Sequence, residues 1–217
     1  MAAVRMGLSL FLLSCLSVLA AAAGEKTATN PQVGARFASV TRDFETEAGV
    51  LDKARGVDGF NPGDVNETLR KTKDATLSSI PTRDKPLRSY VERSFPEPVD
   101  ESATVVQKDV VEKRFSLVRE LLAKLTRLDS FRLDLTVNTK PSSARFELIP
   151  KLGTHLTSTT NSRLTNIYRG EYDYVITKAG YKRVHETINF IERAGNVLEC
   201  DLQPDPGPEE ALPCNFR

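Results

Sequence analysis

The sequence predicts a mainly β fold, in which a small antiparallel β-sandwich follows an amphipathic α-helix and a largely extended or partly helical N-terminal region. Three observations support this prediction. Apolar residues concentrate in the C-terminal half of the chain, the hydrophobic period changes from helical to alternating after Ser130, and turn signals then recur about every 8 to 12 residues. The chain has 30 Lys plus Arg against 29 Asp plus Glu, and this balance disfavours nucleic acid as a partner.

Residues 1–24 have the pattern of a secretory signal peptide. One basic residue, Arg5, precedes an uncharged, Leu-rich stretch that ends in alanines at residues 20–23. We therefore expect a leader that is cleaved, no transmembrane span once it is gone, and a mature protein that is secreted, periplasmic or at the cell surface. The segment ending at Cys15 also resembles the lipobox of bacterial lipoproteins, and on this alternative Cys15 would carry a lipid.

Two cysteines, Cys200 and Cys214, remain after cleavage of the leader. An even number of cysteines in an oxidising compartment predicts a disulfide. Closing a loop of about 15 residues stabilises a fold by roughly 3 kcal/mol in the chain-entropy model. The bond would pin the Pro-rich, acidic tail, residues 203–217, against the last predicted strand.

Residues 25–102 are polar and interrupted by prolines. Such a composition buries little apolar surface, so we expect a polar spacer that is largely extended, disordered or only partly helical. Apolar residues recur at helical spacing in residues 37–51, and a weaker pattern begins at Val65 behind Asp64, which indicates two short helices. The prolines are Pro31, Pro62, Pro81, Pro86, Pro96 and Pro98.

Residues 103–130 predict one amphipathic helix, with apolar residues on one face and charges of both signs on the other. We expect it to pack on the domain that follows, or to self-associate with a second copy as a short coiled coil. Binding to a membrane surface is disfavoured because it would need a wider apolar face and a basic polar face. The apolar face consists of Val106, Val110, Val111, Phe115, Val118, Leu121, Leu122, Leu125 and Leu128.

Residues 131–202 predict six or seven short strands. In the first, apolar side chains at Phe131, Leu133, Leu135 and Val137 alternate with polar ones. Short strands at this spacing indicate an antiparallel sandwich or barrel. The remaining strands are expected at residues 144–149, 156–159, 163–167, 171–178, 181–190 and 196–202.

Two motifs lie within this predicted sandwich. Residues 135–146 form an apolar strand, a turn at Pro141 and a second strand. Residues 169–182 form a Gly-x-Tyr strand that ends at a Gly-Tyr turn, with Gly170 and Gly180 at its two ends. Both motifs resemble the PEGA domain, a short sandwich module of exported and envelope proteins. The resemblance implies a PEGA-like or transthyretin-like sandwich that has no catalytic activity and serves attachment or interaction.

Candidates for chemistry are few. The only two histidines, His155 and His185, have no ligand or triad spacing. We therefore predict that both are surface residues, and that the protein has no catalytic residue, metal site or cofactor. Asn66 begins an N-glycosylation sequon, which matters only in a eukaryotic host.

Four tyrosines cluster in residues 168–181. Tyr172 and Tyr174 share one strand face and are expected to pack in the core. Tyr168 and Tyr181 lie at turns, and together with Arg169 they form the candidate binding surface.

These observations predict an exported, non-enzymatic interaction or structural protein of the cell envelope or extracellular space, which binds a protein or cell-wall partner. The alternative is a carbohydrate-binding module, in which rings of the tyrosine cluster stack on sugars.

Overall fold

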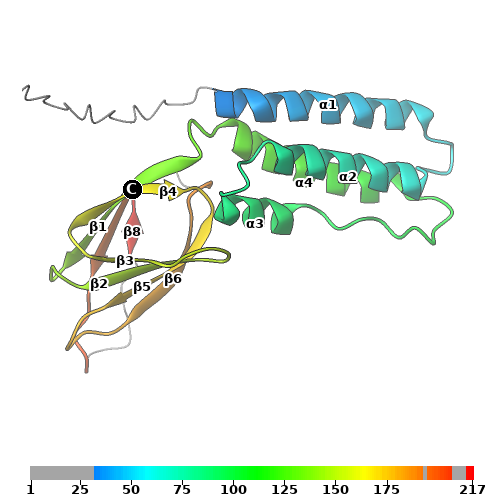
Figure 1. Cartoon of the computed structure of the whole chain (residues 1–217). Helices are drawn as coiled ribbons and strands as arrows, with labels where there is room; N and C mark the ends of the chain where they lie inside the picture. The colour runs from blue at the N-terminus through cyan, green and yellow to red at the C-terminus, as the bar shows by residue number, and fades with distance from the viewer. Residues whose placement is uncertain (1–31, 193–194, 207–213) are drawn as a thin grey trace, which may run out of the picture.

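The computed structural model describes residues 32–192, 195–206 and 214–217, which form a helical bundle followed by a β-sandwich (Figure 1). The predicted leader, residues 1–24, and the alternative lipidation at Cys15 lie outside the described residues. Within the described ranges, no helix combines the length and the apolar character that crossing a membrane requires.

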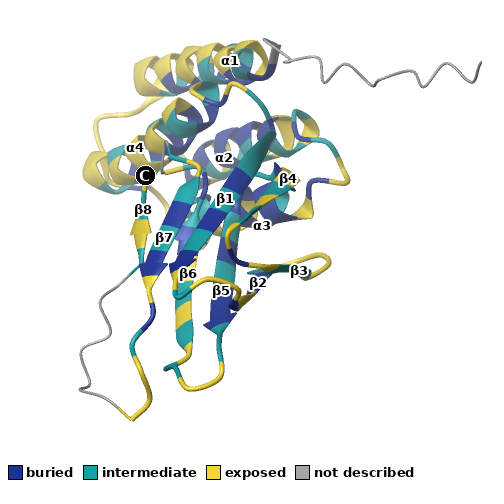
Figure 2. Ribbon diagram, turned by 90° about the vertical axis from the view of Figure 1, so that its left-hand side faces the viewer, coloured by how far each residue is buried: buried dark blue, intermediate teal, exposed yellow. Residues whose placement is uncertain are grey.

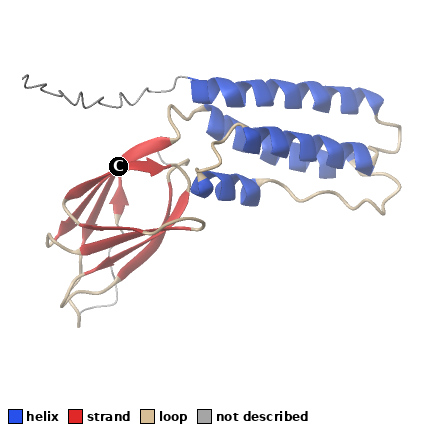
Figure 3. Cartoon of the chain, viewed as in Figure 1, coloured by secondary structure: helices blue, strands red, loops and turns tan. Residues whose placement is uncertain are grey.

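Four helices build the bundle: α1 (Gln32–Ala54), α2 (Pro62–Ser78), α3 (Lys85–Ser94) and α4 (Lys108–Thr126). Figure 3 shows them lying side by side, with the sandwich at one end. α1 packs on α2 and α4, and α3 packs on the same two helices. All four helices share one apolar core. Aromatic rings within it pack edge to face, as Phe44 does against Phe115, with ring centroids 5.2 Å apart.

The two helices predicted within residues 25–102 form as α1 and α2. The largely extended spacer expected around them is wrong for the described part of that segment, because both helices are longer than expected and a third, α3, follows them. Two prolines of the segment lie at helix starts: Pro62 opens α2, and Pro86 lies in the first turn of α3, where a missing N–H costs nothing. Pro81, Pro96 and Pro98 lie in the connections between helices. Polar residues also enter the core, because the hydroxyls of Thr72 and Thr76 each donate to a carbonyl four residues earlier, at 2.8 and 2.7 Å.

The amphipathic helix predicted at residues 103–130 exists as α4, but its apolar face is covered within the chain. Val111, Phe115 and Leu122 are among its residues that are almost fully buried in the bundle core. They face α1 and α3, so neither the sandwich nor a second copy is the main partner of this face. The apolar face that was expected to pair with the sandwich or with a second copy is therefore already covered by the bundle.

The sandwich consists of two four-stranded sheets, ordered β4-β1-β7-β8 and β3-β2-β5-β6. The predicted strands of residues 131–202 all form, with ends that differ by at most a few residues. Their bounds are β1 (Arg132–Lys140), β2 (Arg145–Pro150), β3 (Leu156–Thr159), β4 (Ser162–Tyr168), β5 (Glu171–Thr177), β6 (Val184–Asn189), β7 (Val197–Asp201) and β8 (Asn215–Phe216).

Two features of the predicted fold class need correction. β1 and β7 pair in parallel, whereas every other strand pair is antiparallel. Short turns dictate antiparallel pairing only between sequence neighbours, and β1 and β7 are far apart in the chain. The four helices also hold more residues than the eight strands, so the chain is α+β, and only its C-terminal module is β-rich.

Both sheets contribute to the sandwich core, which Figure 2 shows as buried segments along β1, β5 and β7. Tyr172 and Tyr174 are each 2 % exposed, as predicted from their shared strand face. At the free edge of the second sheet, Glu186 of β6 points inward and accepts a hydrogen bond from the Tyr174 hydroxyl at 2.5 Å. An inward charge of this kind protects an open edge against pairing with other chains.

The predicted disulfide between Cys200 and Cys214 is confirmed. Cys200 lies on β7 and is buried, and the bond to Cys214 holds the C-terminal end of the chain against this strand. The described end then forms β8, which pairs antiparallel with β7, and Phe216 packs against Phe190 at 5.8 Å between ring centroids. The tail is thus pinned as expected, and it adds a strand that was not expected.

Replacing both cysteines with alanine is expected to lower the free energy of unfolding by about 3 kcal/mol, because the unfolded chain regains the freedom of a loop of about 15 residues. Urea denaturation of the oxidised protein and the double variant measures the difference. Wild-type protein reduced before denaturation is the matched control and should resemble the variant. Two free thiols in the intact mass of the untreated protein would contradict the prediction.

Candidate binding site at the junction of the two modules

The bundle and the sandwich meet where α3 packs against the start of β5 (Figure 1). Phe131, which connects α4 to β1, turns its ring edge-on to Phe37 of α1, with centroids 6.3 Å apart. Ile191, after β6, also packs against the bundle core. Apolar contacts from both sides therefore fix how the two modules are oriented.

Gly170 allows the closest approach between the modules. A Cβ on this residue would lie 2.7 Å from the carbonyl carbon of Pro86 and 2.8 Å from the Pro86 Cβ, and its φ is +152°. The second turn glycine of the motif, Gly180, has φ +78° with open space around it. Both glycines thus occupy turn conformations that favour glycine, but only Gly170 also serves contact with the bundle.

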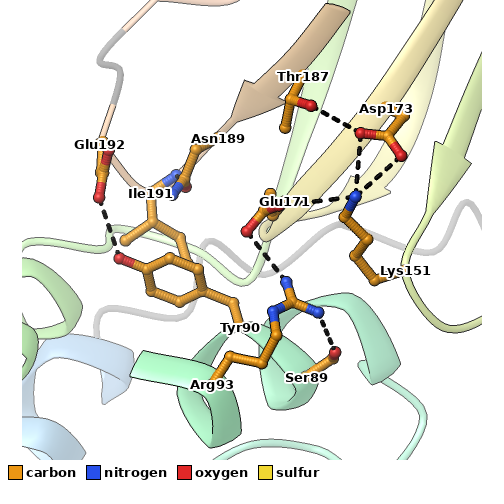
Figure 4. Close-up of polar contacts among 10 residues, drawn as sticks. All are labelled: Ser89, Tyr90, Arg93, Lys151, Glu171, Asp173, Thr187, Asn189, Ile191 and Glu192. Atoms are coloured by element: carbon orange, nitrogen blue, oxygen red, sulfur yellow. Dashed lines mark hydrogen bonds and ion pairs between the residues drawn. The ribbon is translucent and has the colours of Figure 1, made fainter. Parts of the chain in front are cut away.

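A chain of ionic contacts crosses the junction beside this approach (Figure 4). The Arg93 guanidinium of α3 lies 3.0 Å from the Glu171 carboxylate, and it also donates to Ser89 at 2.9 Å. Lys151 contacts Glu171 at 3.9 Å and Asp173 at 2.9 Å. The pKa of Asp173 is lowered by the hydrogen bond from Lys151 and then by that from the Thr187 hydroxyl at 2.7 Å. The charges alternate in sign and are mutually paired.

A second polar contact closes the other side of α3 (Figure 4). The Tyr90 hydroxyl donates to the Glu192 carboxylate at 3.3 Å, and Lys124 of α4 reaches the same carboxylate at 3.2 Å. Burial is the main cause that raises the pKa of Tyr90, and the nearby negative charge of Glu192 adds to it. Tyr90 therefore stays a neutral donor at physiological pH.

Arg169, predicted as part of a binding surface, is instead engaged in this junction. Its Nε donates to the Ser130 carbonyl at 2.9 Å, and its Nη1 donates to the Phe190 carbonyl at 3.0 Å. The half-buried guanidinium ties the entry of β1 to the exit of β6.

The other two candidates, Tyr168 and Tyr181, lie at opposite ends of the sandwich. Tyr168 ends β4 beside the bundle, where Arg132 stacks over its ring at 4.7 Å and donates to its hydroxyl at 2.8 Å. Tyr181 lies beyond β5 and forms a bridge with Pro204. The seven residues of β5 separate the two ends by roughly 20 Å. The tyrosines therefore form no common platform for a sugar, and the carbohydrate-binding alternative has no support from their geometry.

The remaining residues singled out by motif have local roles. Pro141 lies in the turn that takes the chain from β1 to β2, and thus from one sheet to the other; its carbonyl accepts from Thr139 at 2.7 Å. His155 and His185 are exposed, as predicted. Within the three described ranges, no group of three or more His, Cys, Asp or Glu residues could hold a metal ion.

Asn66, the sequon asparagine, is engaged in the bundle. Its amide nitrogen donates to the Val99 carbonyl at 2.9 Å and to Glu101 at 3.0 Å, and its amide oxygen accepts from the Val99 N–H at 2.7 Å. These bonds fasten the segment between α3 and α4 onto α2. A glycan on this nitrogen would be incompatible with them.

Asn66→Ala is expected to lower the free energy of unfolding by about 2 kcal/mol, because the Val99 N–H and carbonyl lose their partners. Thermal denaturation measures the loss. Ser78→Ala, at an exposed position on the same helix, is the control and should be close to neutral. Equal melting temperatures for the two variants would show that the Asn66 bonds contribute nothing.

A groove lies between the α2–α3 connection, the β2–β3 hairpin and the end of β4, and we call it the junction groove. Its volume is about 310 Å³. Two exposed cations, Arg83 and Lys85, stand at it, and neither makes an ion pair or side-chain hydrogen bond within the described part of the chain. Its other lining residues are Pro86, Pro150, Gly153, Thr154, Leu156, Asn166, Ile167, Tyr168 and Tyr172.

Sequence patterns found only part of this site. Tyr168 was a candidate, whereas Arg83, Lys85 and the junction pair Arg93 and Glu171 were not. The signal for the helix that positions them was present, since Asp84 is a good N-cap and a proline follows in the first turn. Nothing in the local sequence indicated that this helix meets the sandwich.

No protein-family model matches the chain, and no curated protein does.

Proposed function

We propose that the chain is an exported, non-enzymatic interaction protein of the cell envelope or extracellular space. The bundle and a PEGA-like sandwich act together in it to bind a protein or cell-wall partner. The disulfide supports an oxidising compartment, and the alternation of strands and turn glycines supports the PEGA-like assignment.

The observation that carries the proposal is the junction groove. Binding sites form preferentially where two modules meet, and this groove has an apolar lining with unpaired charges beside it. Gly170 and Arg93 fix the two modules relative to each other by contacts that cross the junction. A groove with fixed walls loses little freedom on binding, which favours affinity.

The test is retention of a partner from envelope extracts of the source cells on the immobilised mature chain. Arg83→Glu/Lys85→Glu is expected to abolish most of the retention, because it reverses the two free charges at the groove. The control, Arg42→Glu/Lys113→Glu, makes the same change of net charge at exposed positions of the bundle outside the groove. Retention that is equal for both double variants would refute the groove as the contact site.

A further inference from the structure

The lining of the junction groove is mostly apolar. Pro86 of α3 and Pro150 of β2 face it from the two modules, and Leu156, Ile167 and the ring of Tyr172 complete it. Such a surface gains free energy when an apolar group replaces water. A volume of about 310 Å³ lies at the lower end of the range for small-molecule sites, so the group that enters is small.

The charge around the groove is positive. Arg83 and Lys85 have no carboxylate partner, and no Asp or Glu belongs to the described lining. Arg132 is not part of the lining but contacts two of its residues: it donates to the Asn166 side-chain oxygen at 3.3 Å and to the Tyr168 hydroxyl. Two nearby acids are not part of the lining: Asp84 is fully buried, and Asp134, which accepts from the Asn166 N–H at 3.0 Å, is paired with Arg163 at 2.7 Å. A ligand at this groove therefore meets cations at an apolar cavity.

We propose that the junction groove binds a carboxylate attached to a small apolar group, with the apolar group inside the groove and the carboxylate between Arg83 and Lys85. The proposal rests on the proposed function and names the chemistry that the partner presents. Lysine and arginine bind a carboxylate through charge-assisted hydrogen bonds, which are stronger than those to neutral groups. A neutral sugar hydroxyl would accept weaker hydrogen bonds from these two side chains than a carboxylate does, and a cation would be repelled by them.

The experiment is a titration of the full mature chain with octanoate, followed by amide chemical shifts in two-dimensional NMR. We expect saturable shifts confined to the groove, at residues such as Thr154, Asn166 and Ile167. Octanol, which has the same tail without the charge, should bind about tenfold more weakly, and added salt should weaken only octanoate. Equal binding of octanol and octanoate, or no saturable shift in the groove, would overturn the proposal.

The double variant Arg83→Glu/Lys85→Glu should weaken octanoate binding about tenfold, whereas Arg42→Glu/Lys113→Glu should leave it unchanged. Both groove positions are exposed, and a glutamate at position 85 lies in the first turn of α3, where a negative charge is favourable, so the variant keeps its fold. Unchanged octanoate binding by the groove variant would also overturn the proposal.

The outcomes separate this inference from the proposed function. If octanoate does not bind but partner retention still depends on the groove charges, the interaction role stands and the carboxylate ligand is wrong. If octanoate binds but retention does not depend on the groove, the ligand site stands and the interaction role is wrong. Displacement of a retained partner by octanoate, but not by octanol, supports both.

Discussion

Gly170→Ala is expected to lower the free energy of unfolding by about 4 kcal/mol and to loosen the bundle from the sandwich. Two costs combine. A side chain at φ +152° is strained by roughly 1 to 2 kcal/mol, and the new Cβ would lie 2.7 Å from backbone of Pro86, which forces an overpacking shift of roughly 1 to 3 kcal/mol. Because Pro86 belongs to α3, relief of the clash must move one module away from the other.

Gly180→Ala is the matched control for this prediction. Gly180 also has a positive φ, +78°, but no atom lies within 4 Å of a Cβ built there. Its substitution should lower the free energy of unfolding by only about 1 kcal/mol, the cost of a side chain at a positive φ. Urea denaturation compares the two variants, and limited proteolysis between α4 and β1 reports separation of the modules. Equal losses in stability would show that contact with Pro86 is not what constrains Gly170.

The sandwich was predictable because each of its first seven strands has a local pattern. Alternation of apolar and polar residues, as in Leu133, Leu135 and Val137, reflects the two faces of a strand and needs no knowledge of its neighbours. The pairing of strands is not local. The parallel alignment of β1 with β7, and the formation of β8 from Asn215 and Phe216, depend on contacts between segments distant in sequence.

The polar composition of residues 32–94 does not reveal the bundle, because its few apolar residues matter by their position. On the buried side of α3, three large apolar residues, Leu87, Tyr90 and Val91, lie at helical spacing behind Asp84. The junction was beyond sequence reasoning for a stronger reason. Arg93 and Glu171 are 78 residues apart, and a pair of exposed charges has no local signature of its partner. The candidate site therefore depends on the packing of two modules that are distant in sequence.

Asp84 is the one buried carboxylate of the junction whose environment favours the neutral form. It is fully buried at the start of α3, and Oδ1 accepts from the Leu87 N–H at 3.2 Å. Oδ2 has no hydrogen-bond partner in the described part of the chain. Burial raises the pKa of Asp84 to about 7, although the Leu87 hydrogen bond and the positive charges of Arg132 and Arg88 oppose the rise.

The direction of the resulting pH dependence follows from proton uptake. The pKa of Asp84 is about 7 in the folded protein and 3.8 for an ordinary aspartate, so between these values the folded state holds a proton that the unfolded state has lost. Stability from this group is therefore complete below pH 4, falls as the pH rises towards 7, and stays low above it. At roughly 1.4 kcal/mol for each unit of pKa, the loss amounts to about 4 kcal/mol.

Asp84→Asn removes this loss while keeping an oxygen that can cap α3. We expect the variant to be more stable than the wild type above pH 7, with the difference growing by about 4 kcal/mol between pH 4 and pH 8. Urea denaturation across that range measures it. Asp43→Asn, at an exposed position of α1, controls for the change in total charge. A difference in stability that does not vary with pH would mean that the charge of Asp84 is solvated in the folded protein.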